Sequence, residues 1–423
     1  MKVNKMFNIL RHCVQQHTIK NTLGVQSVRT FLSPAYYCNE VWDRRLNSPI
    51  LQKVNVDEFF YELDQRYQKT KELSAVDVDL FVNAIKNEYY VEELLDILHK
   101  LRLTAETCNT LSSTNHGAVR LLMQYGTMEN LANVLDDRLN YGIFLDFYTA
   151  NILMDMCWKK KDFVSGSRIA SQLMLQEDFD HPISTSLSLL HCYNYLLNPN
   201  GWPEYEKPEE PEEEVKVRVK FVRNPYFDDH FDLRDPNKIV GKTLAMFTEG
   251  KNDSLNRSFN ILGNVLFGKE EKATGALDDC VKKGIPLYKE IINLIPPDYT
   301  PELLSKIDIE SSDVQTLLSK SVEKQVHLAS ERDIAEQCKI YLSWEDERIK
   351  AIELQKQRLS TIKRLQNIES LHIALKEKQT RLWFFENEEN IELAIEDGKK
   401  VAPQEKKKVK KTNDENYIPP EIR

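Results

Sequence analysis

Glycine and proline are scarce in this sequence, which has 13 Gly and 16 Pro among 423 residues. An all-β fold needs a turn residue every few positions, so this scarcity argues against one. Long hydrophobic runs are also missing, because no stretch approaches the roughly 20 apolar residues of a membrane-spanning helix. The mean hydropathy is −0.50. We therefore expect a charge-rich helical protein of two or three domains without a transmembrane helix.

Paired cysteines are absent as well. The seven cysteines never form a Cys-x-x-Cys pair, and their number is odd. This pattern argues against a disulfide framework or a zinc site, and free thiols suit a reducing compartment such as the mitochondrial matrix. The net charge is −9, so bulk attraction to nucleic acid is not expected either.

Recognisable catalytic motifs are missing. The segment Val-Gly-Lys-Thr at 240–243 looks like the end of a phosphate-binding loop, but the motif needs glycine at position 236, where the chain has Pro236. The acidic cluster Asp228, Asp229, His230 and Asp232 has no second cluster with metal-ligand spacing. We therefore expect no enzyme activity, no cofactor and no bound metal.

Acidic residues are absent from the first 39 positions. Lysines and arginines there alternate with Phe7, Leu10 and Val14 at helical spacing. A basic amphipathic segment without acids is typical of a mitochondrial transit peptide. We predict such a leader over residues 1–31, with processing close to Arg29. The alternative is a disordered basic N-terminus.

The body of the chain has helical periodicity. Residues 141–180 read as a helix, a short basic turn, a second helix and an acidic turn, and the second helices of such pairs recur roughly every 33 to 37 residues. This spacing predicts an all-α fold, an α-solenoid of stacked helical hairpins over residues 32–197. The alternative is an ordinary helical bundle. The residues expected on the buried faces include Leu80, Phe81, Leu94, Leu98, Leu121, Leu131, Leu135, Leu139, Ile152, Leu153, Ile169 and Leu173.

The stretch at 141–163 closely resembles the pentatricopeptide repeat. In that repeat a turn of the form G-I-x-P-D precedes an opening of the form T-Y-N-x-L-I-D. Here the turn has Leu145 in place of the usual proline. The match is good over one full repeat, fair over the preceding one and weak elsewhere. The matching residues are Gly142, Ile143, Asp146, Thr149, Asn151, Leu153 and Asp155.

A closer resemblance covers most of the chain and is strongest from about residue 110 to 195. The segments FLSPAYYCNEVWDRR, YGIFLD, LMLQEDFD and GKTLAMF occur in this order, before a long charged helix. In these features the chain resembles the family of pentatricopeptide-type protein twenty-seven of the mitochondrial small ribosomal subunit. The resemblance implies a non-enzymatic ribosomal protein of the mitochondrial matrix that supports translation.

The repeat resemblance also implies positions that contact RNA. First helices of pentatricopeptide repeats line a groove for single-stranded RNA, where two or three side chains read a base. By this resemblance Asn151 reads a base with Asp180 or His181 as its turn partner, and Asp146 serves the repeat before. The alternative is that Asn151 caps or hydrogen-bonds within the solenoid.

Basic residues at one hairpin tip suggest phosphate contacts. Lys159, Lys160 and Lys161 form the tip, and Arg168 follows. Cations so placed can neutralise phosphates and release counterions without reading sequence. A solvated basic turn balanced by Asp162 is the alternative.

The remaining segments differ in composition. Residues 198–240 contain an acidic, proline-rich linker and then an extended basic arm, in which Lys216, Arg218 and Lys220 alternate with apolar residues. Such an arm suits RNA or the edge of a partner's sheet, or it is a short surface strand. We predict a further helical hairpin over 241–300, a charged helical hairpin or coiled-coil arm over 313–397, and a disordered Lys-rich tail over 398–423.

Three functions remain open at this point. The first is a structural RNA-binding component of the mitochondrial small ribosomal subunit, with small-subunit ribosomal RNA and neighbouring ribosomal proteins as partners. The second is a free pentatricopeptide factor that binds a mitochondrial transcript (mRNA) or transfer RNA (tRNA). The third is a helical adaptor that binds proteins and does not contact RNA.

Overall fold

The structure, a computed structural model, describes residues 30–203, 227–297, 299 and 307–400. These residues are 76% helical and have almost no strands, which confirms the predicted all-α, solenoid-like fold. The chain divides into two compact units, one ending at Ile352 and one beginning at Glu353. Most of the predicted leader, the basic arm with Lys216, Arg218 and Lys220, and residues 401–423 of the Lys-rich tail lie outside the described residues.

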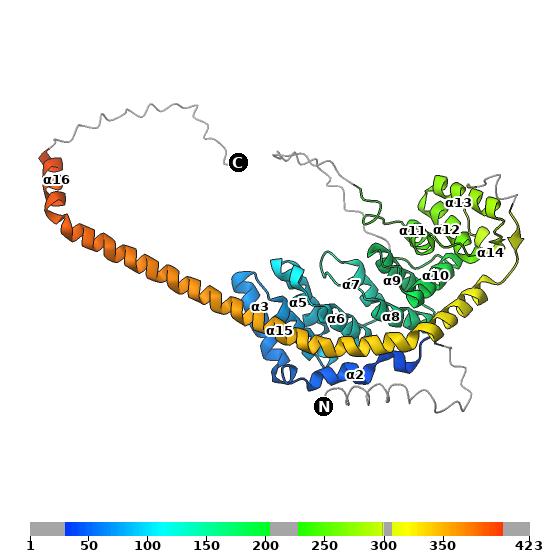
Figure 1. Ribbon diagram of the computed structural model, residues 1–423, viewed down its shortest axis with the longest axis horizontal. Coiled ribbons are helices and arrows are strands. Elements are labelled where there is room, and N and C mark those ends of the chain that lie inside the picture. Colours follow the sequence, from blue (N-terminus) through cyan, green and yellow to red (C-terminus); the bar gives the residue numbers. More distant parts are fainter. Residues whose placement is uncertain (1–29, 204–226, 298, 300–306, 401–423) are drawn as a thin grey trace, which may run out of the picture. The chain divides into compact units, whose positions relative to one another are not determined.

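The first unit begins with short elements and continues as paired helices (Figure 1). One pair of strands, β1 and β2, is parallel and two residues long. The elements up to α14 are η2 (Pro34–Tyr37), α2 (Asn39–Asp43), η3 (Arg44–Asn47), η4 (Leu51–Lys53), α3 (Val56–Thr70), α4 (Ala75–Ala84), η5 (Glu88–Tyr90), α5 (Val91–Arg102), η6 (Ala105–Asn109), α6 (Ser112–Tyr125), α7 (Met128–Asp136), α8 (Phe147–Lys160), α9 (Phe163–Leu175), α10 (Pro182–Leu197), α11 (Pro236–Thr248), α12 (Ser254–Phe267), α13 (Glu270–Lys283), β1 (Leu287–Tyr288) and α14 (Lys289–Ile292). Then follow β2 (Ile309–Glu310), α15 (Val314–Glu386) and α16 (Glu388–Lys400).

The hairpins repeat at a nearly constant interval. Helices α4, α6, α8 and α10 begin at residues 75, 112, 147 and 182, so successive first helices start 37, 35 and 35 residues apart. Side-chain caps define several of these starts. Asp146 accepts a hydrogen bond from the backbone N–H of Thr149 at 2.7 Å, and Asp162 accepts one from Ser165 at 3.0 Å. Such caps satisfy N–H groups that have no partner within the helix.

One hydrophobic core extends through the first unit, from Leu32 to Cys338. Leu153 of α8 and Leu173 of α9 are fully buried in it, as the helical periodicity predicts, and Leu190 of α10 is fully buried as well. Leu139 is an exception: α7 ends at Asp136, and the Leu139 side chain is 76% exposed. The prediction that Leu139 lies on a buried helical face is therefore wrong.

Helices α11 and α12 approach each other through glycines. A Cβ atom at Gly263 would lie 2.5 Å from the backbone nitrogen of Ala245 and 2.6 Å from the carbonyl oxygen of Gly241. Both of these neighbours are backbone atoms, so they cannot move aside by a change of rotamer. Any side chain at position 263 would force the two helices apart.

The substitution Gly263→Ala should therefore lower the free energy of unfolding by about 1–3 kcal/mol. Urea denaturation of the purified chain measures this change. The matched control is Gly275→Ala in α13, where an added Cβ would meet nothing within 4 Å. That control should raise stability by up to about 1 kcal/mol, because alanine favours helix. Equal changes in both variants would contradict the close packing of α11 and α12.

Candidate nucleic-acid interface

The face formed by the first helices of the hairpins is the candidate RNA groove, and helix α15 occupies it. Arg348 of α15 donates from Nε to Oδ2 of Asp79 in α4 at 2.6 Å. Trp344 donates from Nε1 to Oγ of Ser112 in α6 at 3.0 Å. The hydroxyl of Tyr341 lies 2.9 Å from Nε2 of His116. Helix α15 therefore contacts two successive first helices through polar groups, most of which are buried.

The same helix continues to the next hairpins. Oδ2 of Asp333 lies 3.0 Å from Nε2 of His181, which caps α10. Positions 333, 341, 344 and 348 are spaced so that they share one face of a helix. We call these four α15 residues and their partners on α4, α6 and α10 the polar ladder. It fills the surface on which a pentatricopeptide groove would hold RNA.

The segment that precedes α2 fills the same surface. The Tyr148 hydroxyl donates to the carbonyl oxygen of Tyr36, and Nη2 of Arg120 donates to the carbonyl oxygen of Tyr37 at 2.8 Å. Tyr36 is fully buried and its ring stacks on Tyr148 with centroids 5.2 Å apart. Residues 31–42 are therefore an integral part of the folded unit, held by α6 and α8.

Asn151 lies beneath these covering elements. Its side chain is 0% exposed. Nδ2 donates to the hydroxyl of Tyr36 at 3.0 Å, and Oδ1 accepts from Oγ of Ser184 at 2.7 Å. His181, its expected turn partner, lies 3.4 Å from Nδ2. A base could reach Asn151 only by displacing Tyr36 and Ser184, so base reading by Asn151 stays a prediction that this conformation does not accommodate.

Two other residues predicted to contact RNA, Asp146 and Arg168, bind groups of their own chain. Asp146 caps α8 and lies 2.8 Å from Nδ1 of His116. Arg168 is 4% exposed, and its guanidinium binds Asp136 at 2.8 Å and Asn133 at 2.6 Å. Its position holds α9 against α7, which leaves it no surface for a phosphate.

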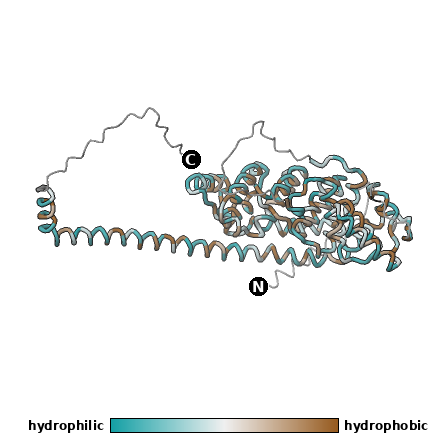
Figure 2. The backbone as a smooth tube through the Cα atoms, turned by 90° about the horizontal axis from the view of Figure 1, so that it is seen from above, coloured by the Kyte–Doolittle hydropathy of each residue, from teal (hydrophilic) through white to brown (hydrophobic). Residues whose placement is uncertain are grey.

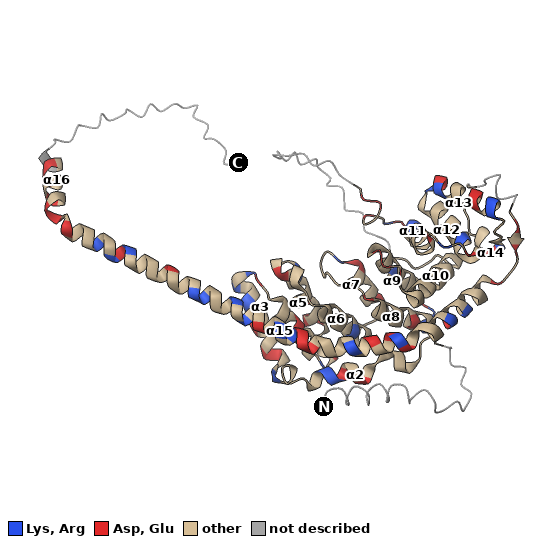
Figure 3. Cartoon of the chain, viewed as in Figure 1, with Lys and Arg blue, Asp and Glu red and all other residues tan. Residues whose placement is uncertain are grey.

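Four other residues that the sequence predicts to contact RNA are exposed to solvent. Lys159 and Lys160 are exposed in the last turn of α8. Lys161 is exposed as well and has φ of 57°, which ends the helix. Asp180 is also exposed, in the turn before α10. The cations of this hairpin tip are thus available to an anionic partner. Figure 3 shows how Lys and Arg are distributed among Asp and Glu along the helices of the chain.

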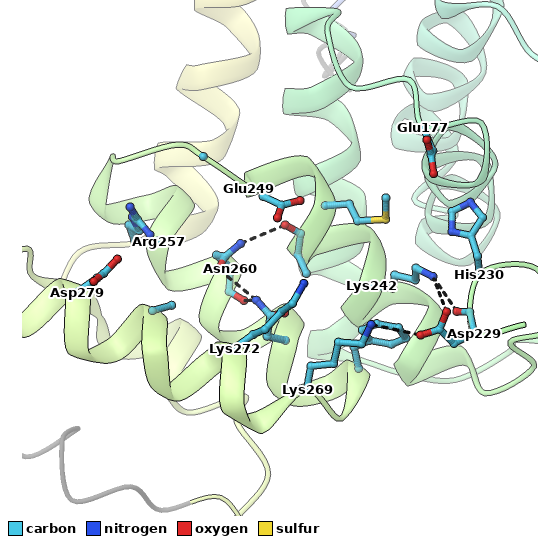
Figure 4. A pocket seen from close by; sticks show the side chains of 16 residues that line it. Glu177, Asp229, His230, Lys242, Glu249, Arg257, Asn260, Lys269, Lys272 and Asp279 are labelled. Carbon is cyan, nitrogen blue, oxygen red and sulfur yellow. Dashed lines mark hydrogen bonds and ion pairs between the residues drawn. The ribbon is translucent and has the colours of Figure 1, made fainter.

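A polar cavity of about 510 Å³ lies between the loop at 229–230 and helices α11 to α13 (Figure 4). Lys242, from the Val-Gly-Lys-Thr segment, is 7% exposed and donates from Nζ to the carbonyl oxygen of Asp229 at 2.7 Å. Nζ of Lys269 lies 3.2 Å from Oδ2 of the same aspartate. The Val-Gly-Lys-Thr segment and the acidic cluster at 228–232 therefore contact each other and stabilise a loop. In the sequence they look like parts of a nucleotide site and of a metal site.

Sequence reasoning missed the residues of the polar ladder. Asp79, His116, Asp333 and Arg348 are each at most 8% exposed. One available signal was a charged residue at a position between apolar ones, such as Asp79 between Val78 and Leu80.

Among the described residues, no three His, Cys, Asp or Glu side chains are placed to hold a metal ion. In the same part of the chain no helix is long and apolar enough to cross a membrane.

Removing the charge of Arg348 should destabilise the first unit strongly. Asp79 is fully buried, so Arg348→Met leaves its carboxylate without a counter-charge and should cost about 3–5 kcal/mol in the free energy of unfolding. Urea denaturation measures the loss. The control Arg358→Met alters an exposed arginine of the same helix and should change little.

The double variant Asp79→Asn with Arg348→Met separates a lost ion pair from lost packing. It should be more stable than Arg348→Met alone, because no charge then remains buried. If the double variant is no more stable than that single one, the ion pair is not what holds α15 to α4.

The model of the family described as "Mitochondrial 28S ribosomal protein S27" matches residues 4–374, most of the chain. The chain therefore belongs to this family, which confirms the predicted family, while the pentatricopeptide character of the repeats stays a prediction. It is a mitochondrial protein of the small ribosomal subunit, and the family favours a non-enzymatic role.

Proposed function

We propose that this member of the family is a structural RNA-binding component of the mitochondrial small ribosomal subunit, located in the matrix and supporting translation. Its proposed partners are small-subunit ribosomal RNA and neighbouring ribosomal proteins. The ribosomal part of the proposal rests on the family match. The observation that carries its structural part is the polar ladder, which fills the groove with the chain's own helix α15. A rigid, self-filled solenoid suits a scaffold that binds through its outer surface.

RNA contact is proposed at the exposed hairpin tip. Lys159, Lys160 and Lys161 present three cations between α8 and α9, and none of them is in an ion pair among the described residues. Clustered lysines bind phosphates electrostatically and give affinity that falls with salt. This mode needs no open groove. The basic arm with Lys216, Arg218 and Lys220 is a second proposed contact, on sequence grounds alone.

Protein contact is proposed for the second unit. From Glu353 onward, helix α15 carries large apolar side chains that are about half exposed or more, such as Leu365 at 60% and Leu371 at 63%. Figure 2 shows hydrophobic and hydrophilic residues alternating along this helix. Unpartnered apolar side chains on a regular helix favour a protein partner. We propose that a neighbouring ribosomal protein packs against them.

The alternative of a free pentatricopeptide factor for a transcript or transfer RNA is less well supported. That function needs base-reading side chains that face an open groove. Here Asn151 is fully buried beneath Tyr36. The adaptor alternative shares the exposed apolar helix with our proposal, and differs only in lacking RNA contact.

Sedimentation tests membership of the assembled subunit. A mitochondrial lysate is separated on a gradient with magnesium, and again with the metal chelated so that the ribosomal subunits dissociate. We expect the chain to travel with the small subunit in both runs, because a structural component does not depend on intersubunit contacts. A chain that stays at the top of both gradients would refute the ribosomal role.

The contribution of the hairpin tip is tested by salt dependence. Replacing Lys159, Lys160 and Lys161 together with alanine should weaken binding to transcribed small-subunit ribosomal RNA. The slope of log affinity against log salt should become less negative by about two to three, one phosphate contact for each lysine. The measurement is a filter-binding titration at several salt concentrations.

A charge-matched control alters three exposed lysines of α15, at positions 320, 324 and 339. This variant should keep most of the wild-type slope. An unchanged slope in the hairpin-tip variant would exclude that tip as a phosphate contact. Absence of RNA binding by the wild-type chain would favour the protein adaptor.

A further inference from the structure

Asp155 of α8 is a buried carboxylate that no cationic side chain among the described residues contacts directly. The residue is 0% exposed. Oδ1 accepts hydrogen bonds from the backbone nitrogens of Phe31 at 2.8 Å and Leu32 at 3.2 Å, and Oδ2 accepts one from the hydroxyl of Tyr37 at 3.1 Å. Among the described residues, no lysine, arginine or histidine lies within 4.0 Å of its oxygens.

Burying a charge in this way is unfavourable. Desolvation raises the pKa of Asp155. The hydrogen bonds from Leu32, Phe31 and Tyr37, together with the more distant charge of Lys159, offset this only in part. Three neutral donors stabilise an anion less than a positive charge at the same distance does. While Phe31 is part of an intact peptide chain, its backbone N–H is neutral. The Asp155 carboxylate then has no positive charge in direct contact with it.

The backbone at Phe31 marks the point where the chain enters the folded unit. Thr30 is exposed, Phe31 is half-buried and Leu32 is 1% exposed. The Phe31 ring packs against Trp158 with centroids 5.1 Å apart, so its nitrogen is held firmly over Asp155. An open cavity of about 470 Å³, lined by Phe31, Trp158 and residues of α9 and α15, adjoins this point.

We propose that Asp155 is the receptor for a new N-terminus, the α-ammonium group of Phe31, formed by hydrolysis of the Thr30–Phe31 peptide bond. A processing peptidase supplies the catalysis. Water gives its hydroxyl to the carbonyl carbon of Thr30 and a proton to the nitrogen of Phe31, which takes a second proton from solvent. The resulting ammonium group lies at the position of the present N–H, 2.8 Å from Oδ1 of Asp155.

This inference rests on the predicted leader and moves its end by one residue, from 31 to 30. It does not depend on RNA binding, so it can fail while the proposed function stands. Its consequence is that removal of the leader completes a buried ion pair. The processed chain then folds more stably than the same chain with a blocked nitrogen at Phe31.

The first measurement is the N-terminal residue of the chain isolated from mitochondrial small subunits, by labelling of free α-amino groups and mass spectrometry. Phe31 is the expected first residue. A chain that begins upstream of Thr30, or downstream at Leu32 or beyond, would overturn the proposal, because no α-ammonium would then form at Phe31.

The second measurement compares two forms of the chain starting at Phe31, one with a free α-amino group and one acetylated. The free form should have the higher urea midpoint at pH 7. An ion pair raises the folded-state pKa of the amino group above its unfolded value of about 7.7–8.0. The added stability is therefore fully present below that unfolded value, and is lost as pH rises through the folded-state pKa.

Substitutions assign this difference to Asp155. In Asp155→Asn the free and acetylated forms should have equal midpoints. In Tyr37→Phe, which removes one hydrogen bond and keeps the carboxylate, the difference should persist, so the comparison survives if Asp155→Asn fails to fold. Equal midpoints of the two wild-type forms at pH 7 would refute the ion pair.

Discussion

The structure depends on one constraint, that the charges buried between helix α15 and the first helices must find partners. Asp79 is fully buried, and it binds Arg348, Ser113 and Thr114. Neither charge of this pair could stay buried alone, because an unpaired ion in the interior costs several kcal/mol. The position of α15 across the hairpins follows from this requirement, and the apolar contacts of the core then fix it.

Because of this constraint, the stacked hairpins do not form an open groove for RNA in this structure. In stacked hairpins that bind RNA, the first helices face an open groove and their polar side chains are free to bind the RNA. Here the same helices point polar groups at Tyr36, Tyr341, Trp344 and Arg348 of their own chain. The surface of the first helices that would line an open groove is therefore buried inside the protein. Among the described residues, the exposed groups that partners can reach include the basic hairpin tip and the apolar side chains of α15 beyond Glu353.

Local pattern in the sequence was enough to predict the hairpins but not the contents of the groove. Apolar spacing identified α8 and α9 because buried apolar residues, such as Ile169 and Leu173 in α9, lie three or four positions apart. The partner of Asp79 lies 269 residues away in the chain, and no periodicity connects the two. The same holds for Asn151, whose polar side chain suits a base and a buried tyrosine hydroxyl equally well. The match of the family model carries the ribosomal assignment, which helical spacing alone could not supply.

The pairing of Asp79 with Arg348 has a consequence for the order of folding. Repeat proteins normally gain structure step by step, since each repeat contacts only its neighbours. In this chain the earliest full hairpin cannot neutralise its buried carboxylate until residue 348 is available. Vectorial synthesis or import therefore delivers an N-terminal half that is incomplete. The final state should form late and cooperatively, with the slower kinetics that contacts distant in sequence impose.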